Sequence, residues 1–222
     1  MLRQRLWTAG LTGLVLLICC ATDARAQLAA RKASDWIGTL ENPERIAGQK
    51  TDQVLAQLSL RRGMVIADIG AGSGLFTRPL AKAVAPGGTV YAVDIQQDLL
   101  DYINQRDQQE QIRNVQTVLG EFSDPKLPAR DVDLALINDV LHHIENRAAY
   151  LKALGTYMKN SGRIAIIEMN KDDLNTPHRK QPELLVSRQD IDQWMSDAGF
   201  KQVQEFPGLF PGTKWFLVYA KK

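Results

Sequence analysis

One short run of the chain combines a carboxylate with three alternating glycines, and these residue types could hold a nucleotide-like ligand. Asp68 closes an apolar run that begins at Met64, and Gly70, Gly72 and Gly74 follow it at alternate positions. Glycine has no Cβ, so it permits a tight turn and lets a ligand lie against bare backbone. A strand, a glycine turn and the start of a helix together form the nucleotide-binding corner of an open α/β sheet. The alternative is a sharp turn without a ligand.

The next strand pattern also ends in an acidic residue. Asp94 closes the apolar run that begins at Val90, and it lies 20 residues after Gly74. A carboxylate at this distance can accept hydrogen bonds from both hydroxyls of a ribose, and Ile95 beside it would pack on an adenine ring. The alternative role of Asp94 is to initiate the helix that follows.

Strand and helix patterns alternate along the chain, which favours an α/β fold with a mostly parallel sheet covered on both faces. Strands are expected at residues 64–69, 89–94, 115–119, 132–137, 163–169, 201–206 and 214–220. Helices are expected at residues 52–60, 75–84, 98–106, 147–158 and 187–199. The glycines and prolines of residues 207–212 join the last two strands as a hairpin, which makes one strand antiparallel.

The glycine run and the motifs after it resemble class I S-adenosylmethionine (SAM) dependent methyltransferases. The form G-x-G-x-G preceded by Asp68 is similar to the first motif of that family, whereas a dinucleotide fingerprint would need a glycine at Leu75. Residues 138–144, with the sequence NDVLHHI, resemble the fourth motif of the ubiquinone and menaquinone biosynthesis type. The resemblance covers residues 64–169 and implies a Rossmann-like, doubly wound, seven-stranded sheet with an antiparallel last strand.

The resemblance also assigns the parts of the cofactor. The glycine turn would hold its methionine portion, Asp94 its ribose, and the loop that starts at Gly120 its adenine. In that loop Glu121 would accept a hydrogen bond from the adenine amino group, with Asp124 as the alternative, and Phe122 would offer its backbone amide. The predicted SAM-binding residues are Asp68, Gly70, Gly72, Gly74, Asp94, Ile95, Glu121, Phe122 and Asn138.

No catalytic residue is assigned from the sequence. A base helps methyl transfer to a phenol, an amine or an acidic carbon, and the candidates are Asp139, His142, His143, Glu168 and His178. Adjacent residues of an α-helix point about 100° apart, so His142 and His143 are not expected to face one ion, and no metal site is predicted. Packing and supporting hydrogen bonds are the favoured role of the two histidines.

Two further segments could complete the site. Residues Arg45, Gln49 and Lys50 precede the first strand, where helices of the family cover the cofactor, and a cation there could pair with the SAM carboxylate. The polar loop at residues 170–186, which contains His178, lies where acceptor-binding segments occur in the family. A solvated charged loop is the favoured interpretation of that segment.

The first 26 residues have the pattern of a secretory signal peptide. Arg3 and Arg5 form a basic start, residues 6–21 are almost wholly apolar, and residues 24–26 (Ala-Arg-Ala) are a cleavage site before Gln27. The apolar run is shorter than the ~20 residues of a membrane-spanning helix. We therefore expect a periplasmic or secreted protein without stable membrane insertion, and an anchored one if the leader stays uncleaved.

The predicted organisation is a signal peptide at residues 1–26, an N-terminal cap segment at residues 27–63 and a methyltransferase domain at residues 64–222. The formal net charge of +2 gives no indication of a nucleic-acid partner. The predicted function is SAM-dependent methylation of a small-molecule acceptor. The alternatives are an exported SAM-binding or scaffold protein without activity, since SAM is made in the cytoplasm, and an oxidoreductase, against which Leu75 argues.

Overall fold

The computed structural model describes residues 32–176 and 178–222. The predicted signal peptide at residues 1–26, and the beginning of the predicted cap segment, lie outside the described residues. None of the helices in the described part of the chain has both the length and the apolar content needed to cross a bilayer.

The strands of the fold alternate with helices, as the sequence predicts. The strands are β1 (Val65–Ile69), β2 (Thr89–Asp94), β3 (Val115–Leu119), β4 (Val132–Asn138), β5 (Met158–Met169), β6 (Phe200–Glu205) and β7 (Lys214–Lys221). The described α-helices are α2 (Ala33–Leu40), α3 (Pro43–Gln49), α4 (Thr51–Gln57), α5 (Thr77–Val84), α6 (Gln97–Gln109), α7 (Arg147–Tyr157) and α8 (Arg188–Asp197). Two short 3₁₀ helices are η1 (Leu141–His143) and η2 (Pro182–Leu184).

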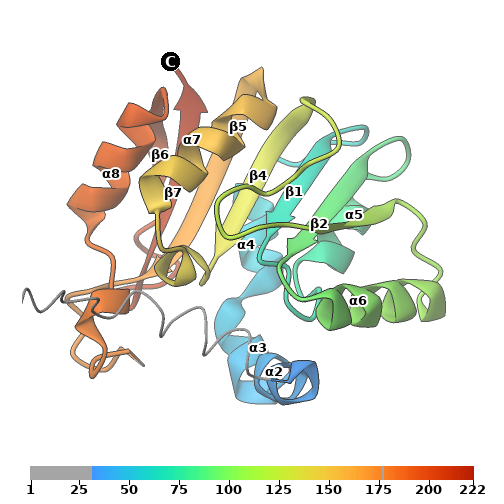
Figure 1. Ribbon diagram of the computed structural model, residues 1–222, viewed down its shortest axis with the longest axis horizontal. Helices are drawn as coiled ribbons and strands as arrows, with labels where there is room; N and C mark the ends of the chain where they lie inside the picture. The colour runs from blue at the N-terminus through green and yellow to red at the C-terminus, as the bar shows by residue number, and fades with distance from the viewer. Residues whose placement is uncertain (1–31, 177) are drawn as a thin grey trace, which may run out of the picture.

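The strands form one seven-stranded sheet in the order β3-β2-β1-β4-β5-β7-β6, and Figure 1 shows its central strands β2, β1, β4 and β5 side by side. Neighbours from β3 to β5 pair in parallel, whereas β7 is antiparallel to both β5 and β6. The predicted mostly parallel sheet with an antiparallel last strand is confirmed. The strand order reverses between β1 and β4, and ligands of such sheets bind at that point, beyond the carboxyl ends of the strands.

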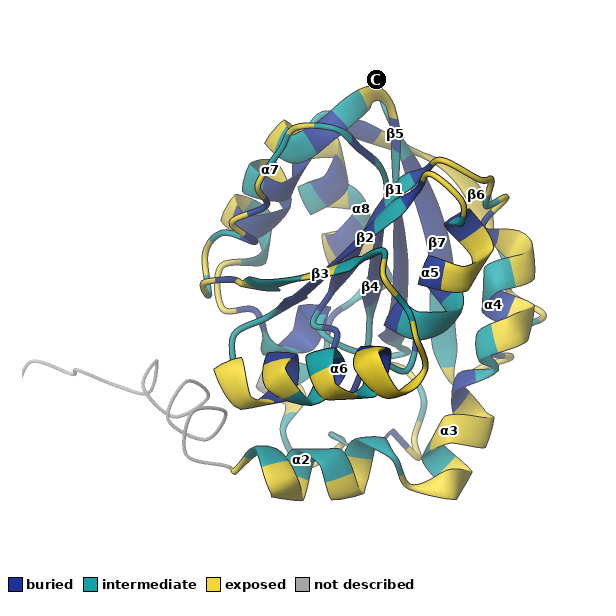
Figure 2. Ribbon diagram, turned by 90° about the vertical axis from the view of Figure 1, so that its right-hand side faces the viewer, coloured by how far each residue is buried: buried dark blue, intermediate teal, exposed yellow. Residues whose placement is uncertain are grey.

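Helices cover both faces of the sheet (Figure 2). On one face, Val54 of α4 and Leu80 of α5 pack with Ile66 of β1 in a buried apolar cluster. On the other face, Leu151 of α7 and Ile191 of α8 pack in a second cluster, which also contains alternate residues of the same central strands. Strand β4 is therefore buried on both sides, which explains its continuous apolar run.

The start of β5 differs from the prediction. The fifth strand is predicted to begin at residue 163, but β5 already begins at Met158. The pairing of β5 with β4 shifts register between Val132 and Leu134. A Cβ placed on Gly162 would lie 3.0 Å from the carbonyl oxygen of Val132. Gly162 therefore permits β5 to approach β4 closely at this point.

Helices α2 and α3 fall within the segment that was predicted to cap the cofactor. Asn42 begins α3, and its side chain accepts hydrogen bonds from the backbone N–H groups of Glu44 and Arg45. Pro43 occupies the first position of α3, where a missing N–H costs nothing. Side chains of both helices reach the cavity at the carboxyl ends of the central strands.

Candidate cofactor and acceptor site

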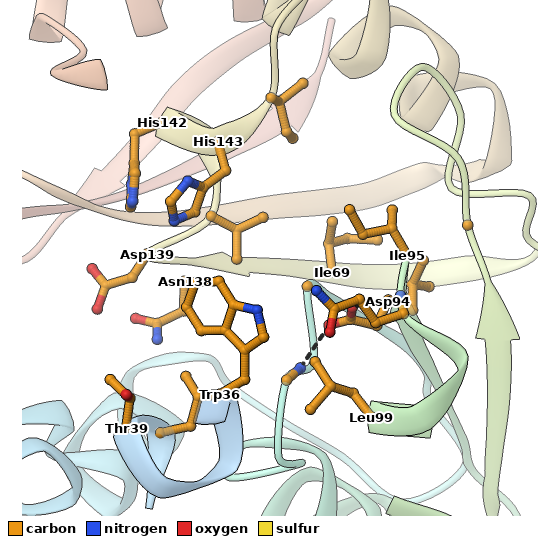
Figure 3. A pocket seen from close by; sticks show the side chains of 18 of the residues that line it. Trp36, Thr39, Ile69, Asp94, Ile95, Leu99, Asn138, Asp139, His142 and His143 are labelled. Atoms are coloured by element: carbon orange, nitrogen blue, oxygen red, sulfur yellow. Dashed lines mark hydrogen bonds between the residues drawn. The ribbon is translucent and has the colours of Figure 1, made fainter. Parts of the chain in front are cut away.

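A cavity of about 660 Å³ lies at the carboxyl ends of β1, β2 and β4, between these strands and helix α2 (Figure 3). Its volume falls within the ~300–1,000 Å³ of small-molecule sites. Seven predicted cofactor-binding residues line it: Gly70, Gly72, Asp94, Ile95, Glu121, Phe122 and Asn138. Asp68 and Gly74 lie behind the turn and are not among the lining residues. Most of the predicted cofactor-binding residues therefore surround one cavity.

The glycine turn forms part of the cavity wall because its backbone is left-handed there. Gly70 has φ +68° and Gly72 has φ +56°, values that L side chains rarely adopt. A Cβ on Gly70 would overlap the side chain of Val140, and a Cβ on Gly72 would lie 2.9 Å from a methyl carbon of Leu40. Both glycines are therefore required by the backbone conformation and by their neighbours.

We expect Gly70→Ala to destabilise the fold by about 1–3 kcal/mol, because alanine is strained at this φ and also meets Val140. Urea unfolding measures the change. The matched control is Gly208→Ala, where a Cβ meets no atom within 4 Å. Equal stability of the two variants would contradict the requirement for glycine in the turn.

The carboxylate of Asp94 is held in place by backbone N–H groups of two neighbouring segments. Its Oδ2 accepts a hydrogen bond from Gly72 N at 2.9 Å, and its Oδ1 accepts one from Gln96 N at 3.1 Å. Burial raises the pKa of Asp94, and these backbone hydrogen bonds offset part of the rise. A carboxylate offers about four acceptor positions, so two remain for a pair of hydroxyl groups in the cavity.

Asp68 supports the turn from behind. Its Oδ2 accepts a hydrogen bond from the hydroxyl of Thr77 at 2.6 Å, and its side chain is buried. Burial raises the pKa of Asp68 to about 6, although the Thr77 hydrogen bond lowers it in part. The residue predicted to contact the cofactor directly therefore links the end of β1 to the start of α5.

The raised pKa of Asp68 predicts a pH-dependent stability. Folding favours the protonated acid, so the free energy of unfolding should fall as pH rises from about 4 to about 6. Asp68→Asn keeps an acceptor for Thr77 but cannot ionise. We expect this variant to flatten the slope and to be more stable at pH 8 by at most about 3 kcal/mol.

Urea unfolding at a series of pH values tests this prediction. The exposed Asp98→Asn variant is the control and should keep the parent slope. If the Asp68→Asn variant also keeps the parent slope, ionisation of Asp68 costs little free energy in the folded state, and the prediction is contradicted.

The loop after β3 favours Glu121 over Asp124 as the acidic residue at the cavity. Asp124 Oδ1 accepts hydrogen bonds from Tyr157 Oη at 2.9 Å and Lys126 N at 2.7 Å, so it is engaged inside the loop. Glu121 lines the cavity and is exposed, with its Oε1 3.3 Å from Lys126 Nζ. Phe122 lies beside it on the cavity wall.

Four polar residues from distant segments form a network at the other end of the cavity. Asn138 Nδ2 donates to Gln49 Oε1 at 3.1 Å, and Gln49 Nε2 donates to Asp139 Oδ2 at 2.8 Å. Lys214 Nζ lies 2.6 Å from the same Asp139 oxygen. The second oxygen of Asp139 and the Oδ1 of Asn138 are buried and have no hydrogen-bond partner among the described residues.

These unpartnered oxygens fit a bound cofactor. Buried acceptors are almost always paired in folded proteins, and both residues line the cavity. The ammonium group of the SAM methionine portion is a suitable donor for Asn138 or Asp139. Together with the two open acceptor positions of Asp94, they allow the cavity to hold both ends of the SAM molecule.

Of the three upstream residues considered from the sequence, two reach the cavity. Gln49 joins the network above, and Arg45 lines the cavity while its guanidinium donates to Leu40 O at 3.4 Å. Lys50 instead donates to the carbonyl of Leu209 at 2.6 Å and is not a lining residue. Arg45 is therefore the cation of this group that a ligand carboxylate can meet.

The three histidines meet at the same end of the cavity. The rings of His142 and His143 are 4.0 Å apart between centroids, and the ring of His178 lies 4.9 Å from that of His142. The two rings lie together although η1 is a 3₁₀ turn, in which successive residues are about 120° apart. Figure 3 shows the His142 and His143 rings side by side near Asp139.

Glu168 at the end of β5 fixes the orientation of His142. Its Oε1 lies 2.8 Å from His142 Nδ1, and its Oε2 accepts a hydrogen bond from His142 N at 3.1 Å. Both side chains are buried. Burial, with the neighbouring histidines, lowers the pKa of His143 to about 3. His143 is therefore a neutral imidazole on the cavity wall.

Several lining residues were not predicted from the sequence. Examples are Trp36 and Leu40 of α2, Tyr150 of α7 and Lys214 of β7. None of them belongs to a local motif, since each reaches the cavity only through the packing of its helix or strand. A tryptophan in the short amphipathic stretch before residue 40 is the single signal that could have indicated a lid.

Comparison with known proteins finds methyltransferases among the relatives of this chain. The demethylmenaquinone methyltransferase of Geobacillus sp. (strain WCH70) is 24% identical over 123 residues, which is 55% of this chain and 53% of that protein. The chain spans about half the length, or less, of the curated relatives that it matches.

Solved structures share the fold. A SAM-dependent methyltransferase from Aquifex aeolicus is 24% identical with a TM-score of 0.75, covering 85% of this chain and 98% of its own. The 1,6-didemethyltoxoflavin-N1-methyltransferase of Burkholderia thailandensis, solved with 1,6-didemethyltoxoflavin and S-adenosylhomocysteine, is 20% identical with a TM-score of 0.68. The match covers 92% of this chain and 92% of the Burkholderia protein.

The family model for the methyltransferase domain matches residues 60–205, well over half of the chain. These residues include the glycine turn, Asp94, the Glu121 loop and the histidines of η1. The chain therefore belongs to the methyltransferase domain family.

Proposed function

We propose that this protein is a SAM-dependent methyltransferase that acts on a small molecule. The observation that carries the proposal is the carboxylate of Asp94, which two backbone N–H groups hold at the end of β2 with two acceptor positions open to the cavity. This arrangement suits the two hydroxyls of a ribose. Leu75 argues against a dinucleotide-dependent oxidoreductase, since it stands where the dinucleotide fingerprint has its third glycine.

The cavity has room and chemistry for the cofactor along one wall. Ile95, Glu121 and Phe122 would surround the adenine, whereas Gly70 and the Asn138 network would hold the methionine portion. SAM carries a methyl group already activated on a sulfonium, so the protein has to align the acceptor and exclude water. Helix α2 contributes to that exclusion, because Trp36 and Leu40 close the side of the cavity away from the sheet.

The remaining wall suits a small acceptor with apolar parts. Ile144, Tyr150 and Met169 line it together with the three histidines. The related proteins point to the same class, since their names specify a demethylmenaquinone and a didemethyltoxoflavin as the molecules methylated. The proposal does not include a nucleic-acid substrate, because the formal net charge of +2 gives no indication of one.

Calorimetry tests the proposal directly. Titration of the purified protein with SAM and with S-adenosylhomocysteine should give one site with micromolar affinity, and NAD should give no heat. Transfer of radiolabelled methyl from SAM is then followed over a panel of phenols, quinols and amines. Absence of heat with both SAM and its product would overturn the proposal, whereas binding without transfer to any acceptor would favour the non-catalytic alternative.

We also propose that the protein is exported. The support is the basic, apolar and small-residue pattern of residues 1–26. N-terminal sequencing of native protein from the periplasmic fraction should give a chain that begins at Gln27. A native protein in the cytoplasmic fraction that begins at residue 1 or 2 would contradict export.

A further inference from the structure

The chain has three histidines in all, and the fold brings every one of them together. His142 and His143 come from η1, whereas His178 comes from the loop between β5 and η2. One ring nitrogen of each can be chosen so that all lie within 4.8 Å of one another. All three rings line the cavity. Packing alone does not require the chain's three histidines to lie together. Their arrangement can serve as a set of metal ligands.

Two of the rings are oriented by a partner on the same ring atom. His142 Nδ1 lies 2.8 Å from the buried carboxylate of Glu168, and His178 Nδ1 lies 3.2 Å from Gln181 Oε1. With Nδ1 as the donor to these two acceptors, Nε2 is the nitrogen of each ring that is left to bind an ion. Histidines that bind metals are held in this way, with the far nitrogen donating to a carboxylate or a carbonyl oxygen.

We propose that His142, His143 and His178 bind one divalent transition-metal ion of the Zn²⁺ type, with its fourth coordination position open to the cavity. Three imidazoles with an open position are the arrangement of a catalytic zinc site. Zn–N bonds of ~2.0–2.1 Å in a tetrahedron place the nitrogens roughly 3.3 Å apart, so nitrogens that lie within 4.8 Å of one another have to approach by up to about 1.5 Å on binding. His178 lies on an irregular loop, where such a movement is possible.

The charges around the three histidines indicate what the open position would bind. The carboxylates of Asp139 and Glu168 are balanced by Lys214 and Arg147, whose guanidinium donates to the His142 carbonyl at 2.8 Å. A divalent ion adds two positive charges to this balanced set. It therefore favours an anionic oxygen, which assigns the acceptor to the hydroxyl class, a phenol or an enol. This role rests on the proposed function, whereas the binding of the ion does not.

The corresponding transfer is balanced. The hydroxyl loses its proton to water when it binds the ion, because a metal lowers the pKa of a bound hydroxyl. The oxygen then forms a bond to the methyl carbon as the carbon–sulfur bond breaks. The sulfur keeps the electron pair, and the products are a methyl ether and S-adenosylhomocysteine.

Cobalt titration of the full chain, purified without a polyhistidine tag and freed of metal with EDTA, tests the site. Co²⁺ should bind with one-to-one stoichiometry and develop the visible absorption of a four-coordinate site, and Zn²⁺ should displace it. Separate His142→Gln, His143→Gln and His178→Gln variants should each weaken binding at least ten-fold. Glu168→Gln, which changes only the partner of a ligand, should weaken it by about ten-fold.

Two controls separate this site from other ligands. The double variant Cys19→Ser with Cys20→Ser removes the only thiols of the chain and should bind Co²⁺ as the parent does. Asp172→Asn removes an exposed carboxylate from the loop that carries His178 and should also leave binding unchanged. Circular dichroism checks the folding of each variant, and His178→Gln keeps the test valid if substitutions in η1 do not fold. Absence of Co²⁺ binding, or binding that survives all three histidine variants, overturns the proposal.

Acetohydroxamate, an anionic oxygen ligand, tests the open position. Its addition should shift the visible spectrum of the Co²⁺ protein, and an unchanged spectrum would overturn the acceptor role. The proposed function is assessed separately by calorimetry with S-adenosylhomocysteine. Co²⁺ binding without cofactor binding refutes the methyltransferase proposal and leaves the metal site, whereas the reverse result refutes the metal site alone.

Discussion

Replacing Asp94 with alanine is expected to weaken the binding of S-adenosylhomocysteine by about 100-fold or more. The carboxylate has two acceptor positions left after its hydrogen bonds to Gly72 N and Gln96 N. Hydrogen bonds to a charged group contribute roughly 1.5–3 kcal/mol each, and two of them account for this loss. The substitution also releases the Gly72 amide, so the glycine turn loses one of its anchors. Isothermal titration of the parent and the variant measures the change.

The matched control for this prediction is Asp98→Ala. Asp98 is an exposed carboxylate on the first turn of α6, four residues from Asp94. It should leave the affinity within about two-fold of the parent. Asp94→Asn keeps one acceptor oxygen and should fall between the two. If Asp94→Ala binds S-adenosylhomocysteine as tightly as the control does, the ribose is not recognised at this residue.

Lys214→Met is expected to lower the free energy of unfolding by about 3 kcal/mol, because it leaves Asp139 buried without its cation. Lys214 Nζ lies 2.6 Å from Asp139 Oδ2, and the two side chains are only 15% and 11% exposed. Burial alone would raise the pKa of Asp139, but Lys214 and Gln49 outweigh it and hold that pKa below its usual value. Urea unfolding at pH 7 measures the loss.

The direction of the pKa shift adds a pH signature to this prediction. A carboxyl with a lowered pKa in the folded state contributes stability above pH 4, and that contribution is lost as pH falls through the folded value. In the Lys214→Met variant Asp139 no longer has its cation, so this loss of stability on acidification should be absent. The double variant Lys214→Met with Asp139→Asn should recover most of the stability, and Lys201→Met on the exposed part of β6 is the control. If Lys214→Met is as stable as Lys201→Met, a structural role for the Lys214–Asp139 ion pair is refuted.

The central part of the site was predictable because its signals are local. The glycine turn follows directly after β1 and Asp94 is the last residue of β2, and parallel strands bring their carboxyl ends to one edge of the sheet. Gly70, Gly72 and Asp94 therefore line the same cavity, as expected. The adenine loop and Asn138 needed the resemblance to a family, since nothing in their own spacing distinguishes them.

The network around Asp139 was not predictable from local patterns. Gln49 lies 90 residues from Asp139, and Lys214 lies 75 residues from it on the other side. Lys214 enters the site only because β7 inserts antiparallel between β5 and β6, next to the end of β5. A lysine at the start of a predicted edge strand would otherwise be assigned to solvent.

The meeting of the histidines was missed for a related reason. The backbone direction of neighbouring helical residues does not determine where their rings lie, and the rings of His142 and His143 are 4.0 Å apart between centroids. His178 reaches them through the path of an irregular loop, and the residue patterns that identify helices and strands do not specify such paths. The prediction that no metal binds there remains a prediction, and the cobalt titration tests it against our proposal.

Helix α2 forms one side of the cavity, yet it buries none of its own residues in the protein. A helix of eight residues is not stable alone in water, and Trp36 and Leu40 face the ligand space instead of a core. A molecule in the cavity therefore adds apolar contacts to this helix, beyond the edge contact between the Trp36 and His143 rings. We therefore expect ligand binding to stabilise α2, so that a measured affinity includes the free energy of holding this wall in place.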